Sequence, residues 1–263
     1  MSDLVYLYGF VPAVVHAPTE SLTGMGGRPV EVLPLPDLGA VISHVSATEF
    51  SQERVEENLQ DLAWVAEQGI AHERVVAHFV DHAQILPASL FTLYSNDNAL
   101  RSAVTAQHDA ILAELRRLSA AREWNLKISY DAGVLSRELG RFSDEVQKID
   151  SEMAEAAPGR KFLLEKKRAE LVKSEVARAA RAQAERVLAA VRPLCVETRT
   201  LPLPQSKDVL PVVLHAALLV ERDREDDVVQ QLEQERTALG DSGLTLSFSG
   251  PWAPYRFVRH EPA

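Results

Sequence analysis

Several features that usually indicate a function are missing from this chain of 263 residues. A single cysteine, Cys195, excludes an intramolecular disulfide and a multi-cysteine zinc site, and it fits a reducing cytoplasm. Because no run of roughly 18 apolar residues occurs and no signal-peptide pattern opens the chain, we expect neither a membrane-spanning helix nor secretion. The phosphate-binding loop, the dinucleotide fingerprint and the nucleophile elbow are also absent, so we expect no cofactor and no hydrolase chemistry.

Positive charge is scarce as well. The 28 Lys and Arg residues face 38 Asp and Glu residues, which gives a formal net charge of -10. Nucleic-acid binders neutralise phosphates with a basic surface, so this balance argues against DNA or RNA as a partner. The length and the 46% hydrophobic content are those of a packed protein with two domains.

The first half of the sequence mixes strand and helix patterns. Apolar and turn residues predict strands at 4–11, 30–35, 40–45 and 85–94, the last being either one bent strand or two short ones. Helical spacing predicts a helix that begins after Ser51, one at 71–82 and one from Asn96 or Asp97 to about 118. We therefore expect an N-terminal α+β domain over residues 1–120.

The second half follows the order β-α-β-β-α-β. Strands are predicted at 123–130, 196–203, 209–221 and 244–250, with a helix at 223–239 and a much longer helical region before it. This is the order of a ferredoxin-like domain, which places helices on one face of an antiparallel sheet. The predicted fold class is α+β: two domains with antiparallel sheets, the C-terminal one at 121–263, ferredoxin-like and carrying an inserted helical hairpin.

The inserted region, about 134–192, predicts two helices that run side by side as an arm. Its first part carries an apolar seam with coiled-coil spacing. The seam consists of Leu135, Leu139, Phe142, Val146, Ile149 and Met153. Pro158 and Gly159 then interrupt the chain before the second helix. Residues 137–192 hold 13 basic and 10 acidic residues, which suits either a solvated helix surface or a docking surface.

The chain closes with an aromatic segment at 250–258. Leu244, Leu246 and Phe248 alternate with polar residues as in a half-buried strand, but two prolines then prevent an ordinary central strand. The candidate partner-binding residues of this segment are Pro251, Trp252, Pro254, Tyr255 and Phe257. Three rings on a stiffened segment form either a strap over the domain's own core or an exposed docking site.

Three histidines are the only candidates for metal chemistry. His78 and His82 lie four residues apart on a predicted helix, with His72 close by. The spacing does not match the His-Glu-x-x-His motif, so partly exposed structural histidines are the simpler interpretation and no metal site is assigned.

Six stretches in the same order resemble the gas vesicle protein F/L family. They are Tyr6-Leu-Tyr-Gly-Phe-Val, Ala71-His-Glu-Arg-Val-Val, Ile85-Leu-Pro with Phe91-Thr-Leu-Tyr, Glu123-Trp with Lys127, Gly159-Arg-Lys-Phe-Leu and Gly250-Pro-Trp-x-Pro-Tyr-x-Phe-Val. One stretch departs from the family pattern. After Leu-Pro the family tends to have Arg-Phe-Gly-Thr, whereas Ser89 and Phe91 replace the arginine and the glycine here.

The resemblance implies a non-enzymatic accessory protein of gas vesicle assembly, acting in the cytoplasm and at the vesicle. Its partners would be the small hydrophobic major shell protein and other gas vesicle accessory proteins. Two alternatives remain open. One is a metal-dependent or small-molecule-binding enzyme on tandem ferredoxin-like sheets, with the three histidines in its site. The other is a coiled-coil scaffold that self-associates through Leu135 to Met153.

Overall fold

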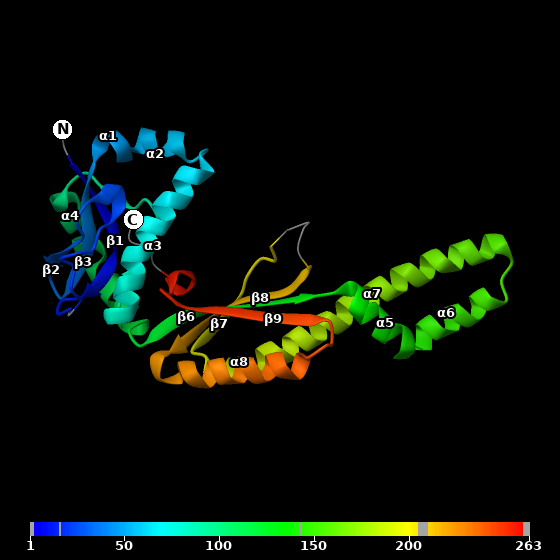
Figure 1. Cartoon of the computed structure of the whole chain (residues 1–263). Coiled ribbons are helices and arrows are strands. Elements are labelled where there is room, and N and C mark those ends of the chain that lie inside the picture. Colours follow the sequence, from blue (N-terminus) through cyan, green and yellow to red (C-terminus); the bar gives the residue numbers. More distant parts are fainter. Residues whose placement is uncertain (1–2, 16, 143, 205–209, 260–263) are drawn as a thin grey trace. The chain divides into compact units, whose positions relative to one another are not determined.

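A computed structural model describes residues 3–15, 17–142, 144–204 and 210–259, with the side chains of 138–142 left aside. The chain forms two compact units (Figure 1). The first combines residues 1–123 with 251–263, and the second spans 124–250. The aromatic C-terminal segment, which the sequence groups with the second domain, packs with the first unit.

The first unit contains an antiparallel sheet built around β1 (Asp3–Pro12). The strand order is β2 (Glu31–Leu35), β3 (Leu38–Ser46), β1 and β4 (Leu86–Pro87), and β5 (Leu93–Tyr94) also pairs with β1. The expected 85–94 strand is thus two short strands. A two-residue turn joins β2 to β3, with Leu35 opposite Leu38 and Asp37 at φ 61°.

Helices cover this sheet. They are α1 (Ala47–Phe50), α2 (Gln52–Asn58), α3 (Leu62–His82) and α4 (Asp97–Arg117), with the 3-10 turn η1 at Met25–Gly27. Side chains of Ser51, Asp61 and Asn96 cap the starts of α2, α3 and α4. Both α3 and α4 contact β1, whose residues from Val5 to Val11 are buried. Burial on both faces explains why β1 reads as a nearly continuous apolar run.

The second unit contains a sheet of four strands in the order β7 (Glu197–Thr200), β8 (Val212–Glu221), β6 (Ala121–Tyr130) and β9 (Leu244–Trp252). Alternate residues of β6, β8 and β9 share one core with α7 (Pro158–Val191) and α8 (Glu225–Leu239). Short turns η2 (Arg192–Leu194) and η3 (Arg222–Arg224) precede β7 and α8. Residue 209, the start of one predicted strand, lies outside the described residues.

The helical arm contains α5 (Ala132–Phe142) and α6 (Asp144–Ala154), which pack along α7 (Figure 1). Leu135, Val146 and Ile149 of the predicted seam are buried, and Met153 is half-buried. The side chains of Leu139 and Phe142 lie outside the described residues. The described seam residues therefore pack inside this chain. Among the described helices, none has a stretch both long and apolar enough to cross a bilayer.

Candidate functional site

The C-terminal aromatic segment packs onto the first unit. Strand β9 ends at Trp252, and the 3-10 turn η4 (Tyr255–Phe257) follows. Phe257 is fully buried, Pro254 is buried and Tyr255 is half-buried, whereas Trp252 is 39% exposed and Pro251 is half-buried beside it. Two aromatic rings therefore cover the core of the first unit, and the third, on Trp252, is partly exposed.

Three carboxylates of the first unit hold this segment. Glu123, near the start of β6 and 1% exposed, accepts the Arg256 backbone N–H at 3.0 Å and pairs with its guanidinium. Glu114 of α4 accepts the Arg259 backbone N–H at 3.1 Å. Glu73 of α3 accepts the Tyr255 hydroxyl at 3.1 Å. Charge-assisted hydrogen bonds from three elements fix the backbone of the segment as well as its side chains.

Arg117 completes this anchor from α4. Its Nε and Nη2 donate to both oxygens of Glu114, at 3.0 and 2.7 Å, and Nη2 also donates to the Phe257 carbonyl. The Arg117 hydrogen bonds lower the pKa of Glu114. Burial has the opposite effect at Glu73, where it raises the pKa despite the hydrogen bond from Tyr255.

A cluster of aromatic rings lies beneath the segment. His72 packs against Tyr6, Tyr8 and Tyr255 with ring centroids 5.7, 5.6 and 6.2 Å apart. The Tyr6 hydroxyl accepts the Phe91 backbone N–H and lies 2.7 Å from Nδ1 of His72. Burial lowers the pKa of His72 to about 4, so the ring is neutral near pH 7. Burial also raises the pKa values of the tyrosines, so this cluster is uncharged near neutral pH.

The three candidate histidines do not form one site. His72 is 4% exposed and belongs to this aromatic cluster. His78 and His82 stack on each other with centroids 4.4 Å apart, and Nδ1 of His82 lies 2.8 Å from the His78 carbonyl oxygen. Within the described part of the chain, no group of three or more His, Cys, Asp or Glu side chains is placed to hold a metal ion.

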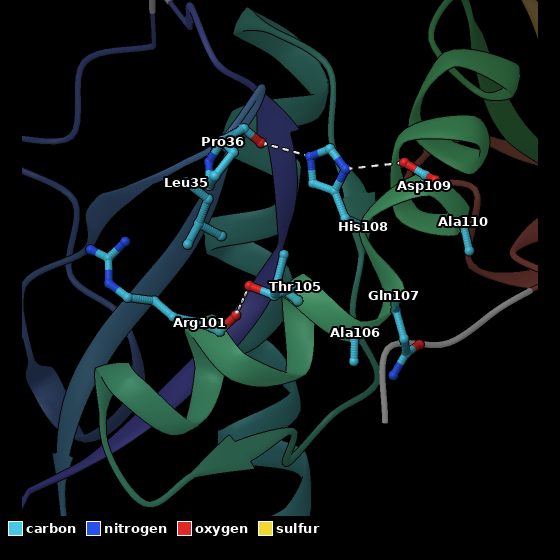
Figure 2. Close-up of a pocket in the computed structure, with 10 residues that line it drawn as sticks. Leu35, Pro36, Arg101, Thr105, Ala106, Gln107, His108, Asp109 and Ala110 are labelled. Atoms are coloured by element: carbon cyan, nitrogen blue, oxygen red, sulfur yellow. Dashed lines mark hydrogen bonds and ion pairs between the residues drawn. The ribbon is translucent and has the colours of Figure 1, made fainter.

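A pocket of about 820 Å³ lies between α4 and the β2–β3 turn (Figure 2). Leu35 and Val104 give it an apolar wall. Arg101 donates to the Pro34 carbonyl at 2.8 Å, and Nε2 of His108 lies 3.0 Å from the Pro36 carbonyl oxygen. The bond to Pro36 is the main reason that the pKa of His108 is raised. These side chains are engaged in fastening α4 to the edge strand β2, which favours a structural role.

Phe91 occupies the position where the family tends to have glycine, and its backbone is left-handed, with φ 65°. A bulky residue is strained there, whereas glycine adopts this conformation freely. The Phe91 ring stacks on Trp64 at a centroid distance of 5.3 Å and an interplanar angle of 7°. This contact offsets part of the strain.

The fold and the site together define a protein of mixed helices and antiparallel sheets. Its most distinctive feature is the aromatic C-terminal segment, which buried carboxylates anchor to the first unit. Comparison with known proteins identifies the family. The chain matches the model of the gas vesicle synthesis protein GvpL/GvpF family over residues 4–259, and it belongs to that family. The resemblance noted in the sequence is confirmed, and membership implies a role in gas vesicle formation.

Individual relatives agree with this assignment. The chain is 28% identical to gas vesicle protein L of Streptomyces sp. (strain CB03234), with 97% of this chain and 92% of the relative covered. It is 26% identical to gas vesicle protein L2 of Halobacterium salinarum, covering 98% and 92%. The crystal structure of GvpF from Anabaena sp. PCC7120 superposes with a TM-score of 0.77 at 17% identity, covering 99% of this chain and all of the other. GvpF from Microcystis aeruginosa gives 0.70 at 18% identity with the same coverage.

The aromatic segment is recognisable in the sequence, but the carboxylates that anchor it are not. Glu73, Glu114 and Glu123 lie 182, 145 and 133 residues from their partners in the segment. No local spacing could reveal those contacts. Glu123 gives no clear signal either, because the sequence of its strand also contains the polar residues Arg122, Asn125, Lys127 and Ser129.

Proposed function

We propose that this chain is a non-enzymatic accessory protein of gas vesicle assembly that binds the hydrophobic major shell protein, other gas vesicle accessory proteins, or both. It would act in the cytoplasm and at the vesicle. A shell protein rich in apolar surface aggregates before assembly unless a partner covers it, and such a partner must later release it. The protein would therefore hold assembly components transiently.

The observation that carries the proposal is the placement of Trp252. Its neighbours Ala253, Pro254 and Phe257 are buried, so the anchor presents a large, partly exposed ring on a rigid backbone. Rigid aromatic residues dominate binding energy in protein interfaces because little entropy is lost when they are buried. Of the five candidate partner-binding residues, Trp252 and the adjacent Pro251 are the ones positioned for contact, while Pro254, Tyr255 and Phe257 serve as anchors.

The second unit supports the same role. In the described sheet, β9 is an edge strand with β6 as its neighbour, and strand addition at a sheet edge is a common way to bind an extended partner. Its order of strands and helices is that of a ferredoxin-like domain, with α5, α6 and α7 as an inserted helical hairpin. We propose that the second unit is a ferredoxin-like domain. Its edge strand β9 ends at Trp252, the partly exposed aromatic residue.

Co-expression with the major shell protein tests the proposal. We expect more soluble shell protein with this chain than without it, and recovery of both in one complex. The Trp252→Ala variant should lose most of this effect, and Trp252→Phe should keep part of it. Leu210→Ala is the matched control, because Leu210 is 40% exposed and Trp252 is 39% exposed. If folded Trp252→Ala protein retained the shell protein as well as wild type, Trp252 would not be the contact.

A further inference from the structure

The start of α7 carries a surface that the packing of the chain does not explain. We call residues 158–167 the arm tip. Phe162 and Leu163 are 57% and 65% exposed, although they are adjacent and apolar. The tip also holds four basic residues against one acidic residue. It lies where α7 follows α6, at the end of the arm away from the strands of the second unit (Figure 1). Exposed apolar side chains ringed by charge are typical of a binding surface.

The cations of the arm tip have no ion-pair partners among the described residues. Farther along α7, Arg168, Arg178 and Arg186 pair with Asp150, Glu175 and Glu235. At the tip, Lys166 lies 4.9 Å from the centre of the Phe162 ring, and Arg160, Lys161 and Lys167 make no ion pair to the described residues.

Two of these charges, on Arg160 and Lys161, are also unfavourable for the helix itself because they lie in its first turn. The first turn of α7 contains no acidic residue, and its N-cap, Ala157, provides no side-chain cap. Positive charge near a helix N-terminus opposes the macrodipole. An acidic partner would offset this repulsion. The positive charges at the tip are therefore better explained by binding than by a contribution to helix stability.

A complementary surface exists in the first unit of the same chain. Residues 47–58, which form α1 and α2, hold four acidic residues against one basic residue. Arg54 pairs with Glu57 at 2.8 Å, and Glu49, Glu53 and Glu56 have no ion-pair partner in the described chain. The four glutamates are exposed.

A pocket of about 450 Å³ adjoins this acidic segment, and we call it the α2 pocket. Its wall is largely apolar, and Gln52 and Glu56 stand at its polar side. The apolar lining consists of Leu4, Phe50, Val55, Phe91, Leu93 and Tyr94. All six are buried or half-buried aromatic or branched residues, which suit an apolar side chain. The pocket thus offers an apolar cavity with negative charge, the counterpart of the arm tip.

We propose that this protein self-associates head to tail, with the arm tip of one copy bound in the α2 pocket of the next. Phe162 enters the apolar pocket, and the tip cations face the glutamates of α1 and α2. Every copy of the chain carries both the basic tip and the acidic pocket. A second copy therefore offers each surface a partner of opposite charge. A contact between two different surfaces is heterologous, so it can build a ring or an open chain of copies. This inference does not depend on binding of the shell protein.

Two charge-reversed variants test the proposal. Lys161→Glu/Lys166→Glu reverses the tip, and Glu53→Lys/Glu56→Lys reverses the pocket side. Sedimentation at concentrations up to about 100 µM detects micromolar association. Wild type should associate with rising concentration, and association should weaken as salt is raised from about 0.05 to about 0.5 M. Each variant alone should associate about tenfold more weakly, because like charges then face each other.

The mixture of the two variants is decisive. Each then meets the opposite charge on the other, so the mixture should associate about as strongly as wild type although each variant alone associates more weakly. Lys173→Glu/Arg181→Glu, at two exposed cations farther along α7, is the matched control and should behave as wild type. A wild type that stays monomeric at every concentration overturns the proposal. So does a mixture that fails to associate while both variants keep the wild-type circular dichroism, or a control that weakens association equally.

Discussion

Removal of the Phe257 ring tests whether the C-terminal segment is part of the first unit. Phe257 is fully buried, and a buried phenylalanine removes about 150–250 Å² from water. At about 25 cal/mol per Å², this burial corresponds to about 4–6 kcal/mol, an upper estimate because unfolded chains are partly compact. Phe257→Ala should therefore lower the free energy of unfolding by about 4 kcal/mol, in the range of other phenylalanine deletions in cores.

Urea unfolding measures this change. For a slope of about 2 kcal/mol per M, the midpoint of the transition of the first unit should fall by about 2 M. Phe162→Ala is the matched control, because the same atoms leave a side chain that is 57% exposed, and the change should be about 1 kcal/mol or less. If Phe257→Ala cost less than about 1 kcal/mol, the segment would be a loosely attached tail, and the description of the anchor would fail.

Three further predictions test the site. Between pH 7 and 5, wild type should lose about 2 kcal/mol more stability than His72→Asn, measured by urea titration at each pH. The reason is that His72 gains a proton below about pH 6.5 in the unfolded state, whereas the buried ring stays neutral to about pH 4. An equal loss in both proteins would contradict the burial of His72. Phe91→Gly should be about 1 kcal/mol more stable than Phe91→Ala in thermal unfolding, since both lose the stacking on Trp64 and glycine alone relieves the left-handed strain. A more stable alanine variant would rule out that strain. Arg256→Ala should destabilise the first unit by about 3 kcal/mol, because Glu123 is left buried without its cation, and Glu123→Gln/Arg256→Ala should recover part of this loss. If the double variant recovered no stability, Arg256 would not act by neutralising the buried Glu123 carboxylate.

Local features of the fold were predictable from the sequence because their causes are local. Ser51 and Asn96 cap helices where the sequence predicted helix starts, and the alternation from Leu244 to Phe248 lies in β9. Pro158 does interrupt the arm, as the first residue of α7. The start of α3 was missed by nine residues. Asp61 caps this helix at Leu62, and exposed Leu62 and Ile70 disturb its apolar pattern.

The discontinuous first unit could not be read from spacing. Its last piece returns after the whole second unit, and Tyr255 meets Glu73 across 182 residues of sequence. The different burial of the three aromatic rings could not be predicted from the sequence either. Trp252, Tyr255 and Phe257 look alike as a sequence motif, and only the packed core decides that Phe257 is buried while Trp252 is exposed.

Photo-cross-linking from position 252 measures the central claim most directly. A photoreactive phenylalanine analogue would replace Trp252 in cells that form gas vesicles, with Val196, which is 56% exposed, as the control position. The account predicts cross-links from position 252 to the major shell protein or to another gas vesicle protein, and far fewer from position 196. Equal cross-linking from both positions, or none from position 252 in a correctly folded protein, would contradict it.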